Sequence, residues 1–108
     1  MAIVLWVSDL HKSVDFYSKL FGSSDCQLSD GFASVKSGGN EVLLHLLPEE
    51  YRSEPSLGEM NPIKPIFEVA RIADFASLLR GEAAQYGDWR YADLADPDGH
   101  IIQIRERA

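Results

Sequence analysis

Two segments of the chain share one pattern, in which a short apolar stretch is followed by apolar residues at helical spacing. The first apolar stretch, Ile3 to Val7, is β-branched and aromatic, which predicts a strand buried on both faces. Ser8 or Asp9 then stands as a helix N-cap, and Gly22 stands where a left-handed C-cap is expected. Between them, one helical face carries apolar residues: Leu10, Val14, Tyr17, Leu20 and Phe21.

Turn residues divide the following stretch into short segments of β type. These segments are Cys26 to Leu28, Phe32 to Lys36 and Val42 to Leu47. The sequence Ser37-Gly38-Gly39-Asn40 is expected to form the hairpin loop between the last two segments. Residues 1–47 therefore predict a module with the order β-α-β-β-β.

The same order returns in shorter form after residue 62. Ile63 to Val69 predicts a strand, and one face of a second helix is marked by Ile72, Phe75, Leu78 and Leu79. Tyr91 to Leu94 and Ile101 to Arg105 predict a hairpin, closed by the turn Asp96-Pro97-Asp98-Gly99, in which both aspartates act as turn formers. Few residues separate the helix from this hairpin, so the strand before it should be short or missing.

The segment between the two copies, residues 48–62, lacks this periodicity. It contains three prolines, one glycine and four glutamates, which predicts a connector or a flap over a site. A chain of 108 residues suffices for one domain with one modest core. The sequence therefore predicts a single α+β domain with two tandem modules, residues 1–47 and 63–108, of which the second is truncated.

Composition narrows the partners and the compartment. The net charge of −7 and the pI near 4.8 argue against nucleic acid and anionic membrane surfaces as partners. Cys26 is the only cysteine, so an intrachain disulfide and C-x-x-C motifs are excluded, as is typical of a reducing compartment. The apolar run at Ala2 to Val7 is too short for a signal peptide or a membrane span, so we expect a cytoplasmic protein.

The opening and closing motifs together resemble a known superfamily. They read Val7-Ser8-Asp9-Leu10-x2-Ser13-Val14-x-Phe16-Tyr17-x2-Leu20-x-Gly22 and Asp96-Pro97-Asp98-Gly99-His100-Ile101-Ile102-Gln103. This pair resembles the vicinal oxygen chelate superfamily, which includes glyoxalase I, bleomycin-resistance proteins, fosfomycin-modifying enzymes and extradiol dioxygenases. The resemblance covers essentially the whole chain, and it implies two curved mixed sheets that face a shared cleft.

The resemblance also implies where a metal would be bound. In metal-dependent members the ligands come from the first and fourth strands of each module, positions held here by Ala2, His45, Lys64 and Gln103. Alanine has no donor atom, and the lysine ammonium is a rare ligand. The two weak candidates that remain, His45 and Gln103, include no carboxylate and make a poor site for a divalent cation. We therefore expect no metal cofactor, and the departure argues against an enzyme.

Strand alternation assigns the residues of the cleft face independently of the resemblance. If Gln103 points into the cleft, Ile101 and Arg105 do too, while Ile102 and Ile104 pack under the helix. The same alternation predicts a mainly apolar pocket whose candidate ligand-binding residues are Trp6, His45, Lys64, Glu68 and Gln103.

Each candidate has a structural alternative. His45 can be a hydrogen-bonded core histidine, and Lys64 can simply pair with Glu68. Trp6 can fill the core or form a stacking platform, and Gln103 can satisfy a backbone group. These alternatives stay open at the level of the sequence.

Three functions follow from this reading. The leading hypothesis is a glyoxalase/bleomycin-resistance-like protein that binds a small organic molecule without metal catalysis. The second is a metal-dependent lyase, isomerase or dioxygenase of the same superfamily, and the third is an interaction protein with a vestigial cleft. Open apolar strand faces that one chain cannot cover also predict a homodimer.

Overall fold

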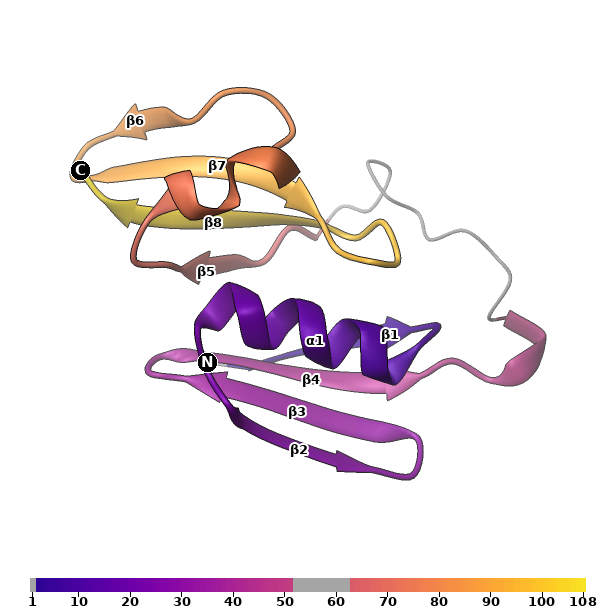
Figure 1. The fold of residues 1–108 in the computed structure, drawn as a ribbon. Helices are drawn as coiled ribbons and strands as arrows, with labels where there is room; N and C mark the ends of the chain where they lie inside the picture. Colours follow the sequence, from indigo (N-terminus) through magenta and orange to yellow (C-terminus); the bar gives the residue numbers. More distant parts are fainter. Residues whose placement is uncertain (1, 52–62) are drawn as a thin grey trace. The chain divides into compact units, whose positions relative to one another are not determined.

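The computed structural model describes residues 2–51 and 63–108, which fall into two compact units divided between Ser56 and Leu57. The first unit contains β1 (Ile3–Val7), α1 (Leu10–Phe21), β2 (Asp25–Ser29), β3 (Phe32–Ser37), β4 (Asn40–Leu46) and a 3-10 turn (Glu49–Tyr51). The second contains β5 (Ile66–Glu68), the 3-10 segment η3 (Ile72–Leu78), β6 (Ala84–Tyr86), β7 (Trp89–Ala95) and β8 (Ile101–Arg107). Each unit is described by itself (Figure 1).

The two units repeat one sheet topology. The strand order is β1-β4-β3-β2 in the first and β5-β8-β7-β6 in the second. In each, the first strand pairs in parallel with the last, and the remaining neighbours are antiparallel. This confirms the α+β fold with two β-α-β-β-β modules. The strand before the final hairpin, β6, has only three residues, as the short spacing predicted.

Local sequence explains how α1 begins and ends. Of the two candidate caps, Asp9 is the one used, because its carboxylate accepts a hydrogen bond from the backbone N–H of Lys12 at 3.0 Å. Gly22 ends the helix with φ +62°, in the left-handed conformation that glycine adopts without a steric penalty. The helix lies over one face of the first sheet and buries Leu10, Tyr17, Leu20 and Phe21 (Figure 1).

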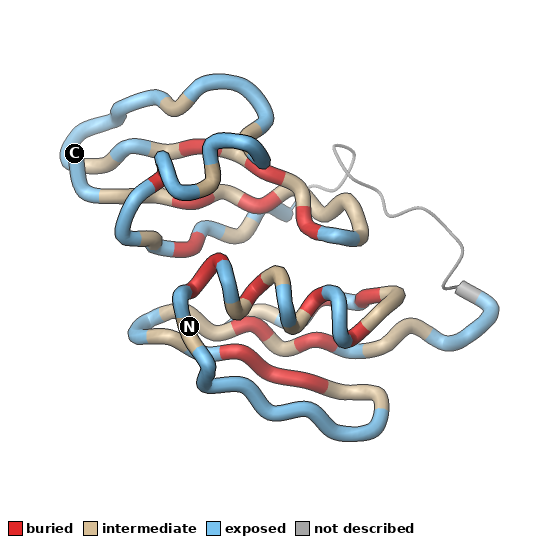
Figure 2. The backbone as a smooth tube through the Cα atoms, in the orientation of Figure 1, coloured by how far each residue is buried: buried red, intermediate tan, exposed pale blue. Residues whose placement is uncertain are grey.

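The prediction that β1 is buried on both faces is wrong. Leu5 and Val7 are buried on one face of the strand, but Val4 and Trp6 on the other are 53% and 54% exposed. In the first unit, buried residues lie along α1 and the central strands, whereas β2 is exposed (Figure 2). The physical reason is that α1 covers only one face of this sheet, whereas a continuously apolar strand is typical of sheets covered on both.

The second helix also differs from the expectation. Instead of an α-helix, η3 is a 3-10 segment, and Phe75 breaks it with φ −116° and ψ 18°. Ile72 is buried as the apolar spacing predicted, but Leu78 is exposed. A helix of only seven residues has little stability of its own. Directly after it, Leu79 forms a β-bridge with Leu94 of β7.

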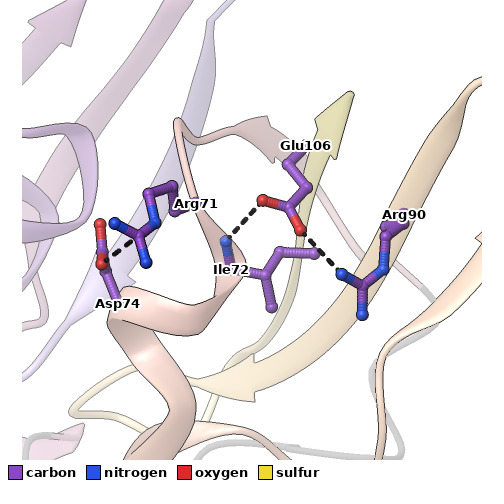
Figure 3. Close-up of polar contacts among 5 residues, drawn as sticks. All are labelled: Arg71, Ile72, Asp74, Arg90 and Glu106. Carbon is purple, nitrogen blue, oxygen red and sulfur yellow. Dashed lines mark hydrogen bonds and ion pairs between the residues drawn. The ribbon is translucent and has the colours of Figure 1, made fainter. Parts of the chain in front are cut away.

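A carboxylate from β8 holds the start of η3. The N-cap residue of η3, Arg71, makes no capping hydrogen bond with its side chain. Instead, Glu106 accepts the backbone N–H of Ile72 at 3.1 Å with one oxygen and binds Arg90 at 3.3 Å with the other (Figure 3). This contact ties the short helical segment to the sheet beneath it.

The predicted connector or flap, residues 48–62, is described only in part. Glu49–Tyr51 forms a 3-10 turn, and residues 52–62 lie outside the described residues. Within residues 2–51 and 63–108, no helix has the length and apolar character needed to cross a membrane.

Candidate functional site

Three rings lie side by side on the face of the first sheet opposite α1. The register pairs Trp6 of β1 with His45 of β4, and His45 with Phe32 of β3. The ring centroids of Trp6 and His45 are 5.3 Å apart, those of Phe32 and His45 are 5.1 Å apart, and both pairs meet edge to face. We call these three residues the aromatic row.

The aromatic row is accessible to solvent. Trp6 and His45 are exposed and Phe32 is half-buried. The interpretation of His45 as a core histidine is therefore wrong: Val42 and Leu44 on the same strand fill the core, and His45 points to the other face by alternation. The neighbouring row on this face adds the exposed Val4 and the half-buried Leu43, which gives the surface a mainly apolar character.

The corresponding face of the second sheet is polar and internally paired. Asp93 of β7 accepts hydrogen bonds from Lys64 and Gln103, each at 3.1 Å, so these two predicted site residues are brought together. The structural alternative, in which Lys64 pairs with Glu68, is therefore not what the structure shows, because Lys64 pairs with Asp93. Glu68 instead binds Arg105 of β8 at 2.9 Å.

Arg105 connects this pairing to an aromatic side chain. The hydrogen bond with Glu68 is the largest cause and raises the pKa of Arg105 above its ordinary value. Desolvation lowers the pKa and is the second cause, and a hydrogen bond with Tyr91 raises it by less. The guanidinium carbon of Arg105 also lies 3.9 Å from the ring centroid of Trp89. The Glu68 carboxylate is thus neutralised within its own sheet.

The four positions that would bind a metal do not fit one. Ala2 has no donor, and Lys64 is engaged as a cation with Asp93. Gln103 donates its amide to the same carboxylate, and His45 is flanked by two rings. In the part of the chain that the structure describes, no group of three or more histidine, cysteine, aspartate or glutamate side chains is arranged to hold a metal ion. Whether metal is bound stays a prediction.

Several site residues were missed at the level of the sequence. The sequence predicts Phe32 only as the start of a strand, and Asp93 and Trp89 are not among the candidate site residues. One signal in the sequence could have identified Asp93 and Trp89. Alternation along β7 places Trp89, Tyr91 and Asp93 on one face, and the structure confirms it by burying Ala92 and Leu94 on the other.

No protein-family model matches the sequence, and no curated protein is significantly similar to it. Solved structures do match over nearly the whole chain. A glyoxalase/bleomycin resistance protein/dioxygenase family enzyme from Burkholderia phytofirmans shares 18% identity with a TM-score of 0.72, covering 99% of this chain and 97% of that one. A putative glyoxalase from Bacillus halodurans shares 14% identity with a TM-score of 0.72, covering 97% and 92%.

A third match is a fosfomycin resistance protein from Listeria monocytogenes, solved in complex with Mn(II) and 1S,2S-dihydroxypropylphosphonic acid. It shares 17% identity with a TM-score of 0.71 and covers 99% of this chain and 88% of that one. At such identities the likeness establishes the fold alone. The chain therefore shares the fold of these proteins, as its resemblance to the vicinal oxygen chelate superfamily implied.

Proposed function

We propose that this protein binds a small organic molecule with a planar apolar part, and that it does so without metal catalysis. The observation that carries the proposal is the aromatic row, in which His45 is held between Trp6 and Phe32 on an exposed face. Aromatic rings at solvent-exposed positions offer large contact area at a small entropic cost. The imidazole of His45 supplies a polar group between two apolar rings. A mainly apolar surface with a few polar groups is the usual composition of a ligand-binding site.

The similar structures support binding of a small molecule in general terms. One of them is complexed with a small phosphonic acid and others are described as glyoxalase/bleomycin resistance proteins. The proposed ligand site differs from the set of residues that the sequence predicts. Trp6 and His45 remain contacts for the ligand and Phe32 joins them, whereas Lys64, Glu68 and Gln103 are committed to partners within the second sheet.

The ligand proposal predicts binding that depends on the aromatic row. In a screen of planar aromatic compounds by isothermal titration calorimetry, we expect at least one to bind wild type saturably. It should bind about fivefold more weakly after Trp6→Phe with His45→Ala, because this change removes one ring and stacking adds about 1 kcal/mol for each ring. Calorimetry is used because the variant lacks Trp6, and Trp89 belongs to the other unit. Leu28→Ala, an exposed apolar change on the same sheet, is the matched control and should bind as wild type does. Equal affinity in all three proteins would remove the aromatic row as the site.

We expect the purified protein to contain no bound metal. Elemental analysis of the purified protein should find no stoichiometric zinc, nickel, manganese or iron, because Ala2 offers no donor and Lys64 is a cation paired with Asp93. The His45→Ala variant should have the same content as wild type. About one metal per chain, lost in this variant, would instead favour a metal-dependent lyase, isomerase or dioxygenase.

We also propose that the chain forms a homodimer. The supporting observation is the pair Val4 and Trp6, both more than half exposed on β1, a strand at the edge of its sheet. An apolar edge strand is a surface that proteins usually cover. Light scattering at micromolar concentration should return twice the 12.0 kDa of one chain. A mass of 12.0 kDa would contradict the dimer, and a dimer that binds no ligand would favour the interaction-protein hypothesis.

A further inference from the structure

Two arginines of β8 contact one tryptophan on the open face of the second sheet. The guanidinium carbon of Arg105 lies 3.9 Å from the ring centroid of Trp89, and that of Arg107 lies 4.3 Å from it. The register explains this arrangement. Trp89 of β7 is the direct partner of Arg107, and Arg105 is the next residue of β8 on the same face.

The two arginines differ in how their charge is balanced. Arg105 is paired with the carboxylate of Glu68 at 2.9 Å. Arg71 and Arg90 also have carboxylate partners, in Asp74 and Glu106. Arg107, by contrast, has no carboxylate within ion-pair distance among residues 2–51 and 63–108, and the indole is the contact that orients it. Among the described residues, the positive charge of Arg107 therefore forms no ion pair, in a chain whose net charge is −7.

The contact with the indole of Trp89 orients the Arg107 guanidinium. A guanidinium has five N–H donors in one plane, and two of them match the oxygens of a carboxylate, phosphonate or phosphate. Contact between its face and the indole restricts the side chain while the donors at its edge remain available. An arginine oriented in this way loses less conformational entropy on binding than a free one.

A further ring extends this surface. Tyr86 of β6 is the direct partner of Trp89 in the register, so Tyr86, Trp89 and Arg107 form a single row across the sheet. Tyr86 is 70% exposed, and its ring centroid lies 6.2 Å from that of Tyr91. An exposed ring beside an oriented guanidinium suits a ligand that carries an oxyanion on a planar body.

We propose that Arg107, with Trp89 and Tyr86, forms a second binding site, selective for small organic oxyanions that have a planar part. This site lies in the other unit from the aromatic row and does not depend on the proposal made for that row. Its selectivity for negative charge comes from the Arg107 guanidinium, which Trp89 orients, and the exposed ring of Tyr86 adds contact with the planar part of the ligand.

The experiment uses the full chain with Trp6→Phe, which leaves Trp89 as the only tryptophan. Its fluorescence is titrated with phenylphosphonate and benzoate, with benzyl alcohol as the neutral analogue and inorganic phosphate as the oxyanion without a ring. We expect saturable binding of phenylphosphonate or benzoate with a Kd of about 1 mM or below, and at least about tenfold weaker binding of benzyl alcohol. Inorganic phosphate should bind more weakly than phenylphosphonate, because it makes no ring contact.

Arginine variants in the same background separate this site from a general effect of charge. Arg107→Gln should weaken binding of the aromatic anions about tenfold, and Arg107→Lys should give an intermediate loss because it keeps the charge without the planar donors. Arg71→Gln removes the same charge from an exposed position in the same unit and should leave the affinity unchanged. The proposal is overturned if Arg107→Gln binds as tightly as its parent, if benzyl alcohol binds as well as the anions, or if no anion binds saturably up to about 10 mM.

Discussion

Asp96→Ala should lower the free energy of unfolding by about 3 kcal/mol, because it removes the acceptor for two backbone donors. Asp96 is only 5% exposed, and its Oδ1 accepts the N–H groups of Asp98 and His100, both at 2.9 Å. The backbone of Asp96 adds hydrogen bonds with His100 and Gly99 that close the same turn. Alanine leaves the backbone N–H groups of Asp98 and His100 without this acceptor, at partly buried positions that water reaches poorly.

Urea unfolding followed by circular dichroism measures this loss. Asp96→Asn keeps an oxygen in the position of Oδ1, so it should lose about 1 kcal/mol, less than half of the effect of alanine. Asp88→Ala is the matched control, since Asp88 is an exposed aspartate beside Gly87 in the turn before β7, and it should change stability by less than about 0.5 kcal/mol. Equal losses for Asp96→Ala and Asp88→Ala would contradict the role assigned to the buried carboxylate.

Ile104→Ala should be similarly severe, with a loss of about 2–5 kcal/mol in the free energy of unfolding. Ile104 is fully buried at the centre of the second sheet, where its register partners are Phe67 and Ala92. Truncation to alanine removes buried methyl and methylene groups and leaves a cavity that a sheet held by neighbours on both sides fills poorly.

The control for Ile104→Ala comes from the other face of the same sheet. Ile66 is the partner of Gln103 and is 49% exposed, so Ile66→Ala should cost less than about 1 kcal/mol. The comparison is best made below the concentration at which any dimer forms, again by urea unfolding. If both variants lose the same amount, the assignment of Ile104 to the core face and Ile66 to the open face is wrong.

Much of the fold could be predicted because its signals are local. The caps of α1 depend on Asp9 and Gly22 alone, and both act as expected. The loop at Ser37-Gly38-Gly39-Asn40 closes the hairpin of β3 and β4, with Ser37 paired to Asn40. Alternation also placed Ile102 and Ile104 in the core and Gln103 on the other face, because successive side chains of a strand point to opposite faces.

The candidate site could be predicted only in part. Trp6 and His45 were assigned to one face, and the structure brings their rings together. Their contact with Phe32 depends on which strands become neighbours, and β1 and β4 are separated in sequence by the helix and two strands. The partner of Lys64 could not be identified from the sequence for the same reason, since Asp93 reaches it from β7 across β8.

The sequence by itself determined the order of the elements, the turns and the face to which each strand residue points, because these depend on backbone preferences and on periodicity within a few residues. Only the tertiary structure decided which face of β1 is covered, that η3 is a broken 3-10 segment, and how the charges of the second sheet pair. These outcomes depend on the register between strands distant in sequence. A charged residue on the second sheet pairs with whichever opposite charge the register brings close to it. The local sequence pattern does not specify that register.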